Sequence, residues 1–131
     1  MRLTTTLLGR VGKDAEVKEV GERDVMNFSV AHTEKWKGKD GQEQERTTWV
    51  NCSRWFKRGS AKVANYIKKG NLIFVEGEPS ARGYTNAAGE VVGSLELRIT
   101  ELKLISNGKE NSTQKEANQG DNGKGEEYLP F

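Results

Sequence analysis

The sequence is short of the residues on which covalent cross-links and metal sites depend. Cys52 is the single cysteine among 131 residues, and His32 is the single histidine. One cysteine excludes an intrachain disulfide, and the paired Cys and His spacing of a zinc site is missing. Apolar runs as long as a signal peptide or a membrane span are missing as well. These absences favour a cytoplasmic protein without a bound metal ion.

Sequence motifs for catalysis are also missing. No glycine-rich stretch has the spacing of a P-loop or of a dinucleotide-binding motif. A lone histidine such as His32 is far more often structural or solvated than catalytic. Glu76 and Glu78 are neighbouring carboxylates, but no candidate nucleophile accompanies them. The sequence therefore gives no reason to expect an enzyme.

The segment 106–125 is polar, with Ala117 as its one apolar residue. This composition cannot bury enough apolar surface to offset the entropy of ordering, so a disordered linker is expected there. Residues 1–105 suffice for one compact domain. They carry 18 basic and 14 acidic residues, whereas residues 106–131 carry 3 and 5. A mildly basic domain with an acidic tail suits a polyanion on the domain and a cationic partner for the tail.

The last six residues combine acidic and apolar side chains. They are Glu126, Glu127, Tyr128, Leu129, Pro130 and Phe131. Such a tip at the end of a disordered tether is a candidate peptide for binding a partner protein. The alternative is that the tail acts only as a solubilising end.

Period-two alternation of apolar residues predicts a chain of strands. The alternation of 94–100 slips by one residue before Leu102, which predicts a bulge near Thr100 and Glu101. The other predicted strands cover residues 3–10, the alternating residues Met26, Phe28 and Val30, the third strand with Trp49 to Trp55, and the more fully buried run 72–77.

Turn and helix signals complete the predicted order. Segments 38–41 and 86–89 are expected to close two projecting hairpins. A short helix is expected between the third and fourth strands, with Ser60 as its N-cap and Gly70 as its stop. Three strands, a helix and two strands is the order of an oligonucleotide/oligosaccharide-binding (OB) fold, a five-stranded Greek-key barrel in the all-β class. An SH3-like barrel is the alternative.

Two tryptophans share the polar face of the third strand. Alternation directs Val50 and Cys52 to one side, and Trp49 and Trp55 to the other side with Asn51. A large ring among polar residues is typical of an exposed stacking surface. The alternative is that both rings pack under a hairpin or at an oligomer interface.

The other aromatic candidates also lie next to positive charge. Trp36 stands between Lys35 and Lys37 at the start of the first hairpin, and Tyr84 follows Arg82 near the second. A sequence-tolerant site for single-stranded nucleic acid needs rings that stack on bases and cations that follow the phosphates. The pattern therefore predicts such a site.

With these elements placed, the chain resembles the bacterial single-stranded DNA-binding protein family over nearly its whole length. The matching motifs occur in the family's order at 9–17, 27–31, 33–36, 47–49 with Trp55, 66–70, 75–77 and 129–131. The resemblance implies a non-catalytic OB-fold homotetramer that has no cofactor and binds single-stranded DNA without sequence preference. It also implies a cytoplasmic, nucleoid-associated protein whose tip recruits enzymes of replication, recombination and repair.

The resemblance assigns roles to individual positions. The stacking aromatics of the family match Trp36, Trp49, Trp55 and Tyr84, and its cationic backbone contacts match Lys57, Lys69 and Arg82. Local context adds Lys35, Lys37 and Arg54 as candidate backbone contacts.

Three positions depart from the family pattern. Val50 stands where members carry a polar residue near the subunit interface, and Gly83 replaces a larger residue beside Tyr84. The tip has only Glu126 and Glu127 close to its apolar residues. Tetramer strength, stacking on Tyr84 and partner affinity are the properties that these departures affect.

An adaptor with secondary nucleic-acid binding and an RNA-binding OB module are the alternative functions.

Overall fold

Six strands and one short helix make up the part of the chain that the computed structural model describes, residues 1–106. The elements are β1 (Thr5–Val11), β2 (Glu16–Val20), β3 (Arg23–Lys37), β4 (Glu43–Lys57), the 3₁₀ helix η1 (Lys62–Tyr66), β5 (Leu72–Thr85) and β6 (Val91–Ser106). The predicted linker 107–125 and the predicted tip 126–131 lie outside the described residues. No helix within 1–106 is long and apolar enough to cross a membrane.

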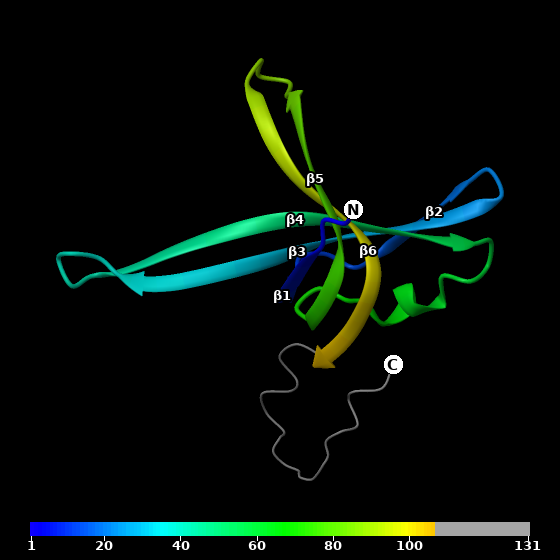
Figure 1. Cartoon of the computed structure of the whole chain (residues 1–131), viewed down its shortest axis with the longest axis horizontal. Helices are drawn as coiled ribbons and strands as arrows, with labels where there is room; N and C mark the ends of the chain where they lie inside the picture. The colour runs from blue at the N-terminus through cyan, green and yellow to red at the C-terminus, as the bar shows by residue number, and fades with distance from the viewer. Residues whose placement is uncertain (107–131) are drawn as a thin grey trace, which may run out of the picture.

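The strands form one sheet that closes on itself. Their order is β1-β5-β6-β4-β3-β2, and β1 also pairs with β3. All pairs are antiparallel except β4 with β6, where residues 50–53 pair in parallel with 95–98. The ring β1-β5-β6-β4-β3 is the predicted five-stranded OB barrel (Figure 1).

One strand outside this ring, β2, was not predicted. It continues along the same edge of β3 as β1, because Val11 pairs with Val30 and Glu16 with Asn27. Every residue of β2 is exposed, so the alternation that reveals a half-buried strand is missing there. Between β1 and β2, Gly12 N–H still donates to Ser29 O of β3 (2.9 Å), whereas Ala15 N–H donates to Ile67 O after η1 (3.0 Å).

The core follows the predicted alternation of the strands. It consists of Val11, Met26, Phe28, Val30, Val50, Cys52, Ala64, Ile67, Ile73, Val75, Leu97 and Ile99. The prediction that 72–77 is more fully buried was wrong for Leu72 and Phe74, which are half-buried. Leu95 is on the predicted apolar side of β6 but is 42% exposed, because it lines an open groove.

The predicted bulge in β6 is confirmed. Glu76 pairs with Glu101 and Gly77 with Ile99, so Thr100 has no partner in the ladder. Its hydroxyl donates to Glu76 O (3.2 Å). A Cβ on Gly77 would lie 2.1 Å from Arg98 O, so this close approach of β5 to β6 requires glycine.

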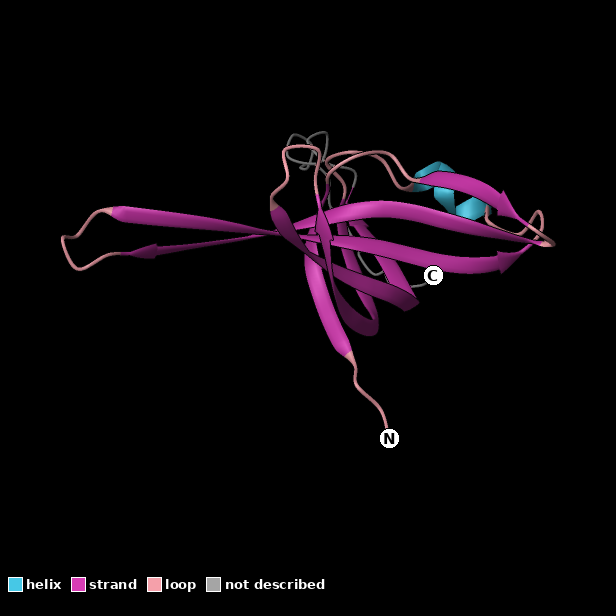
Figure 2. Cartoon of the chain, turned by 90° about the horizontal axis from the view of Figure 1, so that it is seen from above, coloured by secondary structure: helices cyan, strands magenta, loops and turns pink. Residues whose placement is uncertain are grey.

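Both predicted hairpins project from the barrel. The β3–β4 and β5–β6 hairpins leave the body in different directions (Figures 1 and 2). Gly41 (φ 80°) and Gly89 (φ 82°) supply the left-handed backbone that their turns need.

The predicted helix is present as the single-turn η1. Ala64 and the following Ile67 are buried. The prediction of Gly70 as the helix stop was wrong, because the helix ends at Tyr66 with Ile67 as its C-cap, and Gly70 (φ 91°) lies in the turn beyond it. The prediction of Ser60 as N-cap was wrong. The cap position is Ala61, without a side-chain hydrogen bond, because Ser60 N–H closes a turn onto Lys57 O (2.9 Å).

Candidate nucleic-acid interface

The outer face of β4 carries two large exposed rings. Trp49 is 55% exposed and Trp55 is 39% exposed, while Val50 and Cys52 between them are buried on the opposite side. This arrangement confirms the side of the strand that the sequence predicts for both tryptophans. Both rings are exposed to solvent, so stacking on bases and burial at an oligomer interface are the two roles open to them.

Trp49 lies over the backbone at Gly12, the residue that follows β1. A Cβ placed on Gly12 would be 2.4 Å from Cζ3 and 2.9 Å from Cη2 of the Trp49 ring. Ala31, the cross-strand partner of Trp49 on β3, is also small. The two small residues leave room for the ring to lie against the sheet at this point, which holds it in place while most of it faces solvent.

Trp55 has both an apolar and a cationic neighbour. Its partner on β3 is Val25, which is 8% exposed although it lies on the outer face. The Arg23 guanidinium lies 5.5 Å from the centre of the Trp55 ring, in the range of a cation–π interaction. Lys57 is the cross-strand partner of Arg23. One end of the outer face therefore groups a ring with two cations.

The β5–β6 hairpin extends this outer face. Arg82 pairs with Ser94, and Tyr84, which is 51% exposed, pairs with Val92. Arg82 donates to Glu96 (3.1 Å), so this predicted phosphate contact already has an anionic partner. Gly83 alternates to the other side of β5, where an added Cβ would meet only Val92 O at 4.0 Å.

The first hairpin contributes its residues differently. Trp36 is 46% exposed and pairs with Gln44, while Lys35 pairs with Glu45 and Lys37 with Glu43. Alternation puts Trp36 on one side of the ribbon and both lysines on the other. The structure thus brings Trp49, Trp55 and the Tyr84 region onto one face, and leaves Trp36 on a separate arm.

Two of the predicted cations differ in position from the others: Arg54 lies away from the tryptophan face, and Lys69 lies in a loop outside the sheet. Arg54 alternates to the side of Val50, and its guanidinium lies 5.4 Å from the centre of the Phe56 ring. Lys69 is exposed in the loop after η1, where its backbone N–H donates to Asp14 Oδ1 (2.8 Å). Arg54 thus points away from Trp55, its neighbour in the sequence, whereas the loop that carries Lys69 pairs with the end of β1, since Gly70 N–H donates to Val11 O (2.8 Å).

Arg10 and Arg23 are candidates that the sequence did not single out. Arg10 is in one row with Ala31 and Trp49 across β1, β3 and β4, and it donates to Gly70 O (3.1 Å). Both arginines become neighbours of a tryptophan only through the pairing of strands. The family-like motif at 9–17 was the one signal in the sequence near Arg10.

An ion-pair network lies beside Trp55. Asp24 is 6% exposed, and its Oδ2 accepts from Gly59 N–H (2.9 Å). Arg58 Nε is 3.1 Å from Asp24 Oδ1 and its Nη1 is 3.6 Å from Glu19. This network ties the end of β4 to the β2–β3 turn. It therefore fixes the backbone on which Trp55 and Lys57 stand.

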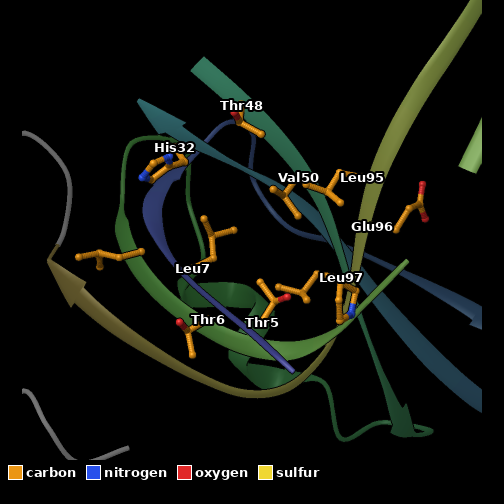
Figure 3. Close-up of a pocket in the computed structure, with 11 residues that line it drawn as sticks. Thr5, Thr6, Leu7, His32, Thr48, Val50, Leu95, Glu96 and Leu97 are labelled. Atoms are coloured by element: carbon orange, nitrogen blue, oxygen red, sulfur yellow. The ribbon is translucent and has the colours of Figure 1, made fainter. Parts of the chain in front are cut away.

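A separate apolar groove opens between β1, β4 and β6 (Figure 3). It is lined by Thr5, Thr6, Leu7, Leu8, His32, Thr48, Val50, Pro79, Leu95, Glu96 and Leu97 and has a volume of about 410 Å³. Leu8 is 52% exposed and Leu95 is 42% exposed. His32 is therefore part of a groove wall, and its Nδ1 is 4.0 Å from a Glu34 carboxylate oxygen.

No group of three His, Cys, Asp or Glu side chains that could hold a metal ion occurs within residues 1–106. Cys52 is 2% exposed, and its burial raises the pKa of the thiol to about 12. A thiol that stays protonated near neutral pH is a poor nucleophile. The described surface is thus one of rings and charges rather than of reactive groups.

A model of the Single-strand binding protein family matches residues 3–105. The chain belongs to this family. The predicted family is thereby confirmed, and a family of binding proteins agrees with the prediction that the chain is not an enzyme.

Two relatives in the single-strand binding protein family are similar to most of this chain. A single-stranded DNA-binding protein of Neisseria meningitidis serogroup A is 37% identical over 108 residues, which is 81% of this chain and 61% of the relative. Single-stranded DNA-binding protein 1 of Xylella fastidiosa is 30% identical over 118 residues, covering 88% of this chain and 85% of the relative. The chain thus spans less than two thirds of the length of the Neisseria relative.

Solved structures support the fold. A Plasmodium falciparum SSB in complex with ssDNA has a TM-score of 0.64 at 21% identity, over 79% of this chain and 94% of that chain. A small single-stranded DNA-binding protein from Streptomyces coelicolor has a TM-score of 0.66 at 11% identity, with the same coverage of both chains. The OB fold predicted from the order of elements is confirmed, and the SH3-like alternative is set aside.

Proposed function

We propose that this member of the single-strand binding protein family binds and protects single-stranded DNA without sequence specificity. The observation that carries the proposal is the outer face, on which Trp49, Trp55 and Tyr84 are exposed across three paired strands. Base stacking on an aromatic ring is worth about 1–3 kcal/mol per base and tolerates any sequence. The relatives that are named single-stranded DNA-binding proteins support the same ligand.

The cations divide into two groups in this proposal. Lys57 and Arg23 flank Trp55, and Arg10 is in line with Trp49, so these three are well placed to follow phosphates beside stacked bases. Lys35, Lys37 and Lys69 are exposed on the hairpin and the η1 loop, and would hold strand segments that run beyond the face. Arg54 is the weakest of the predicted contacts, because it faces away from both tryptophans.

Titration with a homopolymer oligonucleotide tests the proposal. Tryptophan fluorescence should be quenched as bases stack, and the affinity should fall as salt rises because phosphate contacts release counterions. Trp49→Ala and Trp36→Ala should weaken binding of all sequences alike. The absence of quenching at low salt, or an effect limited to one sequence, would contradict the proposal. Competition with RNA of equal length distinguishes a dedicated RNA-binding module, which would use the 2′-hydroxyl.

The apolar groove and the edge of β1 support the predicted homotetramer. Residues 5–9 pair with β5 on one edge, and β1 pairs with β3 only at Arg10 and Val11, so the rest of the second edge pairs with no described strand. An unpaired edge beside a groove with half-exposed leucines is a surface that a second copy of the chain can cover. Val50 lines this groove, where an apolar side chain suits burial between subunits. Measurement of the solution mass with and without oligonucleotide tests the assembly and its stoichiometry together.

Partner recruitment is proposed for the tip 126–131. The support is the sequence motif alone, since the tip is outside the described residues. Through it the protein would recruit enzymes of replication, recombination and repair to the coated strand, and DNA binding would make it nucleoid-associated. Deletion of Tyr128 to Phe131 should leave DNA affinity in place and abolish capture of such an enzyme. Loss of DNA binding upon deletion would contradict this division of labour.

A further inference from the structure

The outer face separates its two tryptophans on β4 by a long stretch of sheet. Trp49 and Trp55 are six residues apart on one strand, which corresponds to about 20 Å. Arg10 is in the row of Trp49 across the sheet. Arg23 and Lys57 pair with each other in the row beyond Trp55. These cations therefore lie at the two ends of the stretch, and a DNA strand that stacks on both rings must cross the part between them.

Two rows of outward-facing residues cross the sheet in this middle part. They are Ser29, Asn51, Glu96 and Ser80 in the row nearer Trp49, and Asn27, Ser53, Arg98 and Glu78 in the row nearer Trp55. Arg98 is the one cation in these two rows of the described sheet. Its direction follows from its neighbour Leu97, which pairs with Cys52 and is buried, so alternation turns Arg98 outward beside Ser53.

Arg98 forms an ion pair with Glu78, its cross-strand partner on β5. Arg98 Nη2 donates to Glu78 Oε1, and the two side chains are 62% and 51% exposed. An ion pair that is exposed to this extent contributes little to stability, because water and salt screen the two charges. A phosphate can therefore take the place of the Glu78 carboxylate at small cost.

The neighbouring ion pair on the same two strands is built differently. Arg82 donates to Glu96 Oε2 (3.1 Å), which also accepts from Ser94 Oγ (2.8 Å). The Glu96 side chain is 29% exposed. Glu78, in contrast, accepts from Arg98 alone among the described residues. Of the two arginines, Arg98 is the one that can change partners more easily.

We infer that Arg98 binds a phosphate of the DNA strand between Trp49 and Trp55, and that Glu78 holds Arg98 until DNA takes its place. The inference rests on the proposed binding of single-stranded DNA and adds a binding residue to it. The planar guanidinium can donate two parallel hydrogen bonds to one phosphate. A phosphate contact reads no base, so this role agrees with binding that tolerates any sequence.

Substitutions on the two sides of the ion pair separate this role from a structural one. Arg98→Ala removes the phosphate contact and should weaken binding of a dT homopolymer about 3-fold to 10-fold at low salt, because the bond to phosphate replaces an existing ion pair. Glu78→Gln removes the competing carboxylate and should strengthen binding. A pair that only holds β5 against β6 is broken by both substitutions, which would then change the affinity in the same direction. That result, or unchanged affinity in Arg98→Ala, would overturn the inference.

The salt dependence of binding gives a second measurement. In a Glu78→Gln background no freed carboxylate takes up a salt cation, so Arg98→Ala there should flatten the slope of log K against log [salt] by about 0.7, the value for one phosphate contact on a single strand. Lys103→Ala is the control for the loss of one positive charge. Lys103 is an exposed residue of β6 that pairs with Phe74, about 15 Å along the strand from Arg98. Equal effects of Arg98→Ala and Lys103→Ala on affinity and slope would overturn the inference.

A modified ligand tests the same contact from the side of the DNA. A dT oligonucleotide with methylphosphonate linkages keeps its bases but carries no charge on its backbone. The difference in affinity between the wild type and Arg98→Ala should disappear with this ligand, because its backbone offers no anion to the guanidinium. A difference as large as that seen with ordinary dT would overturn the inference and leave the proposed function intact. Failure of the wild-type protein to bind ordinary dT would overturn the proposed function as well.

Discussion

Gly12 gives the sharpest single test of the proposed binding face. The proposed Gly12→Ala substitution adds one methyl group at a position where the Trp49 ring already lies 2.4 Å from the added atom. Ordinary van der Waals contact begins at 3.4 Å, so the ring must move by about 1 Å or rotate away. The ring is the part that yields, because it is 55% exposed whereas Gly12 and its neighbours belong to the paired backbone.

The binding free energy that Gly12→Ala loses cannot exceed the contribution of the Trp49 ring. Trp49→Ala should cost about 1–3 kcal/mol of binding free energy, the general value for one stacked base, which is about 5-fold to 150-fold in affinity. Gly12→Ala should fall between the wild type and Trp49→Ala, since the ring is displaced but still present. Folding stability should change little. Gly→Ala lowers the conformational entropy of the unfolded chain, which stabilises the fold by about 0.4–1 kcal/mol and offsets the cost of moving the ring.

Fluorescence titration with a dT homopolymer measures these affinities, and Gly93→Ala is the matched control. Gly93 is in β6, and a Cβ there would meet no atom within 4 Å. The Gly93→Ala variant should bind the oligonucleotide as tightly as the wild type does. If Gly12 acts only through Trp49, then Gly12→Ala should have no further effect in a Trp49→Ala background. Additive losses in this double-mutant cycle, or equal binding by Gly12→Ala and Gly93→Ala, would refute the reasoning.

Three further predictions concern other parts of the described domain. Burial raises the pKa of Cys52 to about 12 from a reference value of 9.0, so the native state keeps a proton that the unfolded state loses. The wild type should therefore lose stability between about pH 9 and 12 relative to Cys52→Ala, as urea unfolding at both ends of that range would measure; identical pH dependence would contradict this. Asp24→Ala removes the buried carboxylate that accepts from Gly59 N–H, and should lower the free energy of unfolding by about 1.5–3 kcal/mol in the same assay, the range for a hydrogen bond to a charged group. Leu95→Glu puts a charge into the apolar groove and should shift the solution mass toward smaller species, whereas Val91→Glu, at an 83% exposed position of the same strand, should leave the mass unchanged.

Local rules predicted those features whose signal is local. The phase slip after Ile99 predicted the bulge at Thr100, because side chains alternate with a fixed period and one extra residue shifts every following one. The same period predicted that Trp49 and Trp55 share an exposed face. Ser60 failed as an N-cap since its backbone is used in a turn onto Lys57, and such a turn leaves no sign in the capping pattern.

Features that depend on the partner strand were beyond local rules. β2 carries no alternation because both of its faces are exposed, and only its pairing with β3 makes it a strand. Arg54 is an exception: it was assigned to the site because it is adjacent to Trp55 in the sequence, although local alternation already directs it to the side of Val50. Arg23 is 32 positions before Trp55 and is nevertheless its closest cation over the ring.

By itself the sequence determined the class of fold, the family and the exposed aromatic side of β4, because composition, periodicity and motif order are properties of the chain alone. The tertiary structure decided which cations accompany which rings, why Gly12 must be small and how Arg82 and Ser94 hold Glu96. These depend on the register between strands far apart in sequence. Register is set by packing of the whole barrel, since a slip of one residue would turn every core side chain to solvent.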